Sequence, residues 1–127
     1  METKKILVIE DNPTNMELIT DLLEAYGYQV IGAATAGEGI IQAQTVAPNL
    51  ILMDLSLPDM DGLDATWQLK QDEATQHIPI VALTAHALKE FEAKSLEVGC
   101  AGYITKPIDT RTLPKAVARL LAEHQAI

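Results

Sequence analysis

The sequence predicts an α/β fold, in which a doubly wound, five-stranded parallel sheet is covered by five helices. Short apolar runs alternate along the chain with stretches of helical spacing, which is the pattern of repeated βα units. Several of these runs are continuously apolar, as strands buried on both faces of a parallel sheet are. We therefore expect strands at residues 5–9, 29–33, 50–54, 78–84 and 102–105.

Helix caps and stops separate these strands. Asn12 and Pro13 have the residue types of an N-cap and a first helical position, and Gly27 is suited to end that helix. Thr35 with Glu38 forms a capping-box pattern at the start of the second helix. The helices are expected at 13–26, from 35 to about 47, from 62 through 69, at about 89–98, and after residue 112 to about 125.

Helical spacing also indicates which side chains are buried. The inner face of the first helix is expected to carry Ile19, Leu22, Leu23 and Tyr26. Met16 and Leu18 lie on the flanks of that helix and should be half exposed. We interpret Trp67 as a packing residue and Cys100 as a small buried residue. The helix at about 89–98 has a thin apolar stripe (Leu88, Phe91 and Val98), so it should be weakly anchored.

Composition limits the possible classes of protein. The 127 residues are 48% hydrophobic and 21% charged, which is typical of one globular domain, and we assign residues 1–127 to it. The net charge of −9 argues against binding to nucleic acid or to an anionic membrane. No apolar run approaches the roughly 18 residues of a membrane span. With one cysteine and no room for a signal peptide before the first strand, a cytoplasmic protein is expected.

Four of the five predicted strands end in polar residues. Right-handed crossovers bring the carboxyl ends of parallel strands to one edge of the sheet, where α/β folds bind ligands. We therefore expect one shallow pocket that contains Glu10, Asp11, Asp54, Thr84 and Lys106.

The residue types in this pocket favour magnesium and phosphoryl chemistry. Clustered carboxylates repel one another, and Mg²⁺, which prefers oxygen ligands, would relieve the repulsion. Lys106 and Thr84 could stabilise phosphoryl oxygens, and a central Asp54 could act as a nucleophile that forms an aspartyl-phosphate. Taken singly, each residue has a simpler explanation: Asp11 could belong only to a turn, Thr84 could merely end a strand, and Lys106 could be a solvated loop residue.

Four motifs make the chain resemble the receiver domain of two-component response regulators, in particular single-domain members of the CheY-like and DivK-like types. They are ILVIEDN at 6–12, LILMDLSLPDMDG at 50–62, IVALTA at 80–85 and YITKPI at 103–108. The resemblance covers essentially the whole chain, and it implies a flavodoxin/CheY-like fold with strand order 2-1-3-4-5.

The resemblance also implies roles for individual residues. Asp54 would accept a phosphoryl group from a phosphohistidine on a histidine kinase or a histidine phosphotransfer protein. Asp11 and Asp54 would bind Mg²⁺ directly, Glu10 would do so through water, and the main-chain carbonyl of Ser56 would be a further ligand. Thr84 and Lys106 would bind phosphoryl oxygens.

A second set of implied features concerns signalling. The Lys106–Pro107 bond is expected to be cis, and Thr84 with Tyr103 would form the conformational switch. Upstream partners would contact the first helix, where Met16 and Leu18 are candidates. Slow, Mg²⁺-dependent self-phosphorylation and self-dephosphorylation are expected, together with a downstream protein target and a monomeric or weakly dimeric state.

Three alternatives stay open at this point. A haloacid-dehalogenase-like phosphohydrolase would have a second aspartate two residues after Asp54, where this chain has Ser56. A receiver acting only as a binding module would not need a complete pocket. A receiver fragment of a hybrid histidine kinase is the third, although Met1 and the chain length favour a free-standing protein.

Overall fold

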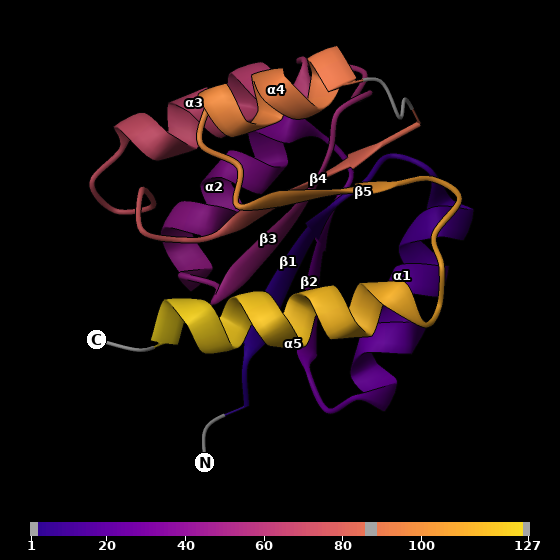
Figure 1. Cartoon of the computed structure of the whole chain (residues 1–127). Helices are drawn as coiled ribbons and strands as arrows, with labels where there is room; N and C mark the ends of the chain where they lie inside the picture. The colour runs from indigo at the N-terminus through magenta and orange to yellow at the C-terminus, as the bar shows by residue number, and fades with distance from the viewer. Residues whose placement is uncertain (1–2, 86–88, 126–127) are drawn as a thin grey trace.

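The computed structural model of the protein describes residues 3–85 and 89–125, and it contains five βα units (Figure 1). The elements are β1 (Lys5–Ile9), α1 (Pro13–Ala25), β2 (Gln29–Ala33), α2 (Ala36–Val46), β3 (Leu50–Asp54), α3 (Gly62–Gln71), β4 (Ile80–Thr84), α4 (Lys89–Glu97), β5 (Gly102–Thr105) and α5 (Thr112–Gln125). All neighbouring strands pair in parallel in the order β2-β1-β3-β4-β5. The predicted fold and the implied strand order are thus confirmed.

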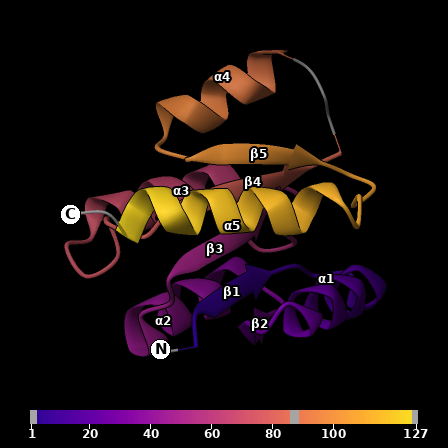
Figure 2. The ribbon, with the colours of Figure 1, turned by 60° about the horizontal axis from the view of Figure 1, so that its bottom comes forward.

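Two helical layers cover the sheet. Helices α1 and α5 lie against one face, and α2, α3 and α4 lie against the other (Figures 1 and 2). Strand residues alternate between two apolar clusters: Leu7, Ile9, Ile51 and Met53 pack on the α2–α3 side, and Ile6, Val8, Leu50 and Leu52 pack on the α1–α5 side. Each such side chain contributes roughly 2 kcal/mol on burial. Because both faces are covered, β1 is apolar from Ile6 to Ile9 and β3 from Leu50 to Met53.

Strand β4 is shorter than the predicted strand, because it begins at Ile80 and not at residue 78. Pro79 has no N–H to donate to a neighbouring strand. Its carbonyl still accepts a hydrogen bond from Ile51 N at 3.0 Å, so Pro79 adjoins the sheet without joining the ladder. Ile78 is buried nevertheless.

Helix α1 begins at the predicted residue, but it ends one residue earlier than predicted. Asn12 Oδ1 accepts hydrogen bonds from Thr14 N at 2.9 Å and Asn15 N at 3.1 Å, which satisfies two free amides of the first turn. Tyr26, which was predicted to face inward, is 62% exposed. The helix ends at Ala25 and Tyr26 is its C-cap, so its side chain does not continue the inner face.

The interpretation of Trp67 as a packing residue is wrong, since its side chain is 54% exposed. The buried residues of α3 are Gly62, Ala65, Thr66 and Leu69. At 100° per residue, Trp67 lies about 150° from the centre of that buried face. The tryptophan therefore projects from the outer side of the helix.

Helix α4 has few buried side chains among those that the structure describes. Ser95 is buried and Leu96 is 56% exposed. Val98, just after the helix, packs against the core on the α2–α3 side, and Cys100 is buried there as predicted. The predicted contacts of Leu88 and of the Phe91 side chain lie outside the described residues. None of the helices within the described part of the chain is both long and apolar enough to cross a membrane.

Candidate functional site

The structure brings the five predicted pocket residues to the carboxyl edge of the sheet. Asp54 and Thr84 are the last residues of β3 and β4, Glu10 and Asp11 follow β1, and Lys106 follows β5. Glu10, Asp54 and Thr84 are almost completely buried, whereas Asp11 is exposed. The pocket therefore has buried acidic residues at its base and is open to solvent on the Asp11 side.

Lys106 joins the two buried carboxylates. Its Nζ lies 2.9 Å from Glu10 Oε1 and 3.2 Å from Asp54 Oδ2. Only 19% of the Lys106 side chain is exposed, so little water screens these ion pairs. The ammonium group is the counter-charge that makes burial of both acids possible.

Local hydrogen bonds fix the two acids. Ser56 N donates to Asp54 Oδ1 at 3.0 Å, and Asn12 N donates to Glu10 Oε2 at 3.1 Å. Each carboxylate thus has one oxygen held by a backbone amide and the other directed at Lys106. The backbone at Glu10 is held as well, because its amide donates to Ala33 O at 3.0 Å.

The Lys106 backbone is positioned by β4. Lys106 N donates to Thr84 O at 2.7 Å, and Thr84 lies opposite Thr105 in the β4–β5 register. The bond between Lys106 and Pro107 is cis. These contacts put the start of the Lys106 side chain beside the end of β4.

The two buried carboxyls have opposite pKa shifts. Burial, followed by the hydrogen bond with Asp54, raises the pKa of Glu10 above its ordinary 4.5, although Lys106 and Asn12 oppose this. Burial also acts to raise the pKa of Asp54, but the Ser56 amide, Glu10 and Lys106 together lower it below 3.8. The pKa of Lys106 is raised, because the two carboxylates outweigh its burial. Asp54 is therefore the more acidic of the two carboxyls, and it is the one that stays anionic to lower pH.

The donor set fits a magnesium ion. One carboxylate oxygen from each of Glu10, Asp11 and Asp54 lies within 4.8 Å of the others. The Asp11 side chain makes no hydrogen bond or ion pair with any residue that the structure describes, so it is available to a ligand. Mg²⁺ prefers oxygen ligands and keeps several waters, which suits a site open on one side.

Tyr103, the predicted switch partner of Thr84, lies on β5 opposite Ala82, and its side chain is 37% exposed. A hydrogen bond with Glu92, and the charge of that carboxylate, raise the pKa of the Tyr103 phenol. The ring is therefore linked to α4 and does not lie buried beside Thr84.

Met16 and Leu18, the predicted partner residues, differ in exposure. Leu18 is 39% exposed, as expected for a flank position. Met16 is partly buried, and its Cε lies 3.2 Å from where a Cβ on Gly32 would be. Leu18 is thus the more accessible of the two.

Two residues that support the pocket were not identified from the sequence. A Cβ on Gly62 would lie 2.4 Å from Asp54 O and 2.7 Å from Leu55 Cα, so only glycine fits at the start of α3. Asp59 accepts hydrogen bonds from Ala36 N at 2.9 Å and Gly37 N at 3.0 Å, which ties the loop after β3 to α2. The sequence predicted a helix that begins at Gly62, but it did not indicate either contact, since both depend on tertiary structure.

Comparison with known proteins gives the family. The response regulator receiver domain family matches residues 6–118. The chain belongs to that family. It is 40% identical to the polar-differentiation response regulator DivK of Brucella ovis over 121 residues. These residues make up 95% of this chain and 98% of that protein. A receiver is a signalling module of two-component systems, so the predicted family and signalling class are confirmed.

Solved receiver structures are similar to the whole fold. A CheY-like receiver domain protein from Methanospirillum hungatei has a TM-score of 0.91 and 31% identity, covering 98% of each chain. The receiver domain of a sensor histidine kinase from Pseudomonas aeruginosa has a TM-score of 0.87 and 33% identity, covering 95% of this chain and 99% of that one. That receiver has a magnesium ion coordinated in its active-site cleft.

Proposed function

We propose that this receiver takes a phosphoryl group on Asp54 from a phosphohistidine of a histidine kinase or a histidine phosphotransfer protein. The observation that carries the proposal is the contact of Lys106 Nζ with both Asp54, at 3.2 Å, and Glu10, at 2.9 Å. This arrangement keeps Asp54 anionic and puts a positive charge where phosphoryl oxygens would arrive. We further propose that residues 1–127 form one receiver domain.

The transfer conserves charge and atoms. Asp54 Oδ2, the oxygen not held by Ser56, attacks phosphorus while the bond from phosphorus to the imidazole nitrogen breaks, and that nitrogen keeps the electron pair. Lys106 exchanges its contact with Asp54 for one with a phosphoryl oxygen, and the Thr84 hydroxyl donates to another. Asp54 thereby becomes a mixed anhydride.

Mg²⁺ would be held directly by Asp11 and Asp54, through water by Glu10, and by the main-chain carbonyl of Ser56. When bound, it neutralises charge on the phosphoryl oxygens as the new bond forms. The carboxylate spacing of the three acids supports this ligand set. Small phosphoryl donors should also react slowly, and the phosphorylated form should lose its phosphoryl group slowly to water.

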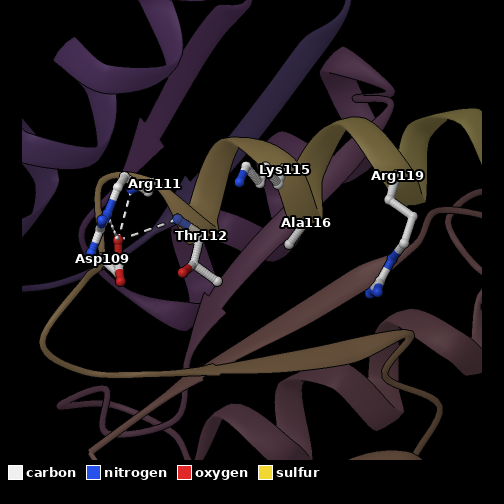
Figure 3. A pocket seen from close by; sticks show the side chains of 6 residues that line it. All are labelled: Asp109, Arg111, Thr112, Lys115, Ala116 and Arg119. Atoms are coloured by element: carbon white, nitrogen blue, oxygen red, sulfur yellow. Dashed lines mark hydrogen bonds and ion pairs between the residues drawn. The ribbon is translucent and has the colours of Figure 1, made fainter.

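The signal would leave through protein contact from the face formed by α4, β5 and α5. Phosphorylation is proposed to draw Thr84 inward, to let Tyr103 move from Glu92 into the vacated space, and to shift α4. On α5 of the same face lies a depression of about 420 Å³, lined by Asp109, Arg111, Thr112, Lys115, Ala116 and Arg119 (Figure 3). A charged surface of this kind suits a protein target.

Beryllofluoride, which mimics the phosphoryl group, tests the switch. Nuclear magnetic resonance spectra with Mg²⁺ and beryllofluoride should show shifted amide signals between residues 85 and 105. The switch proposal is wrong if the amide signals from residue 85 to residue 105 keep the positions that they have without the analogue.

Phosphotransfer tests the acceptor and the upstream contact. A radiolabelled histidine kinase should transfer label to the wild-type protein and not to Asp54→Asn, and EDTA should stop the transfer. Leu18→Asp should slow transfer from the kinase but leave phosphorylation by acetyl phosphate unchanged, because Leu18 lies outside the pocket. If Asp54→Asn were labelled at the wild-type rate, Asp54 would not be the phosphoryl acceptor. If the wild-type protein took no label at all, it would be a receiver that only binds partners.

Upstream and downstream partners are thus proteins, and we propose a cytoplasmic protein that is a monomer or a weak dimer. The phosphohydrolase alternative is disfavoured, since Ser56 offers no carboxyl to act as general acid. Light scattering at several protein concentrations tests the proposed oligomeric state.

A further inference from the structure

Trp67 is the only tryptophan in the chain, and it stands between two surface depressions on the outer side of α3. One depression, next to α2, is lined by Ile40, Gln44, Trp67, Gln68, Leu69, Gln71 and Asp72. The other is lined by Met60, Asp64, Trp67 and Gln68. We call the residues of both depressions the Trp67 face. A large aromatic ring exposed between two hollows is typical of a protein-binding surface.

The charge on the Trp67 face is acidic. Asp64 lines one depression and Asp72 the other, and no Lys, Arg or His is among the described residues that line either. Lys70 of the same helix is turned away, since its Nζ donates to Gln76 O at 3.0 Å and to Ile78 O at 2.6 Å. No positive charge of α3 therefore balances these carboxylates.

The two acids differ in availability. Asp72 accepts hydrogen bonds from Gln44 Nε2 at 2.9 Å and Ala74 N at 2.9 Å, so it is held in place and joins α3 to α2. Asp64 is exposed and makes no hydrogen bond or ion pair with the described residues. It precedes Trp67 by three positions, so the carboxylate and the indole are neighbours on the helix surface.

We propose that the Trp67 face binds a segment of another protein, and that an arginine or lysine of this segment stacks on the Trp67 ring and pairs with Asp64. A cation is attracted to the face of an indole, and a nearby carboxylate completes its recognition. Ile40 and Met60, which are only partly buried, supply apolar walls for the side chains that flank the cation. The partner is thus a basic segment with apolar residues beside its cation.

Charge argues against the other occupants. Nucleic acid is an anion and would be repelled by the acids of this face. A second copy of this chain has a net charge of −9 and would be repelled as a whole, so it could approach only through its α5 depression, which carries Arg111, Lys115 and Arg119. The proposal does not depend on Asp54 or on phosphorylation.

A synthetic helical peptide with two arginines and two leucines on one side tests the proposal through the fluorescence of Trp67. Mg²⁺ is kept in excess, so that the acidic pocket does not attract the peptide. We expect a saturable change in Trp67 emission, and amide shifts confined to α2 and α3. A matched peptide with glutamine for arginine should bind about fivefold more weakly.

Variants locate the binding site. Asp64→Asn should weaken binding of the arginine peptide about twofold to threefold. Trp67→Ala should abolish the α2–α3 amide shifts, whereas Tyr26→Ala, which alters an exposed aromatic residue on the α1 side of the sheet, should not change them. Thermal unfolding checks that the variants fold.

Several results would overturn the proposal. Equal binding of the glutamine peptide or of a glutamate peptide would exclude cation recognition, and shifts centred on other elements would exclude this surface. A concentration-dependent dimer that Trp67→Ala abolishes would assign the face to a second copy of the chain. The absence of any saturable change would also refute it.

Discussion

Lys106 sets the charge state of the pocket, because it is the cation between two almost fully buried carboxylates. The two carboxyls that it pairs with make contributions to folding stability that depend on pH. The lowered pKa of Asp54 contributes stability that is present above pH 3.8, its ordinary value, and is lost as pH falls through the folded pKa. The raised pKa of Glu10 has the opposite sign, so stability is lost as pH rises from 4.5 through its folded pKa.

Replacing Lys106 with methionine leaves these two acids facing each other without a counter-charge. In EDTA at pH 7, we expect Lys106→Met to lower the free energy of unfolding by about 2 to 4 kcal/mol, and at pH 4 by clearly less, since Glu10 is then protonated. Urea denaturation at both pH values measures this. The double variant with Glu10→Gln should recover part of the loss. An equal loss at both pH values would mean that Lys106 acts only through packing.

Asp11 separates metal binding from folding, because its exposed side chain has no partner among the residues that the structure describes. Asp11→Asn should therefore unfold in EDTA at the wild-type urea concentration or slightly above it, since the change also removes one of three carboxylates that repel one another. With Mg²⁺ at one hundred times its dissociation constant, the wild type should gain about 2.7 kcal/mol and the variant much less. A variant that gains as much as the wild type would remove Asp11 from the ligand set.

At the scale of elements, the pocket depends on how closely α3 approaches β3. Gly62 begins α3 against the backbone of Asp54 and Leu55, with no room for a Cβ. Helix α2 is tied to the same region, since Asp59 caps its first amides. Asp54 therefore lies at a strand end that α2 and α3 hold from one side, whereas α4 has few buried side chains among those that the structure describes.

Gly62→Ala tests this approach, and Gly37→Ala is its matched control. A Cβ on Gly37 would meet only Asp59 Oδ2 at 3.5 Å, an ordinary contact. We expect Gly62→Ala to cost about 1 to 3 kcal/mol of stability from overpacking. Gly37→Ala should leave stability unchanged or raise it by about 0.5 to 1 kcal/mol, as alanine does within a helix. Urea denaturation compares them; equal effects would refute the close approach.

At the scale of the whole molecule, the sequence was sufficient to predict the fold and to predict that the five pocket residues meet at one edge of the sheet. Apolar runs such as Ile6–Ile9 specify buried parallel strands, and parallel strands bring the residues after their carboxyl ends to one edge. What it did not reveal depends on tertiary neighbours. Tyr26 and Trp67 have large aromatic side chains, yet both are exposed. Tyr26 is exposed because α1 ends before it, and Trp67 is exposed because it lies on the outer side of α3. The tight contact of Gly62 is likewise visible only once α3 is docked.

The assembled molecule has three distinct surfaces around one core. The acidic pocket lies at the carboxyl edge of the sheet, the basic depression lies on α5, and the Trp67 face lies on α3. The pocket and the Trp67 face are acidic, whereas the α5 depression is mainly basic, so the α5 depression suits a partner of opposite charge to the other two. On the functions proposed above, this separation would let one small domain receive a phosphoryl group at the pocket and contact other proteins elsewhere.

The most direct measurement for this account is mapping of the phosphorylated residue. The protein is incubated with Mg²⁺ and a phosphoryl donor, the acyl phosphate is trapped by borohydride reduction, and the modified peptide is identified by mass spectrometry. We predict modification at Asp54 alone, and none in Lys106→Met at the same time point. Modification at Glu10, at Asp11 or on another element would contradict the account.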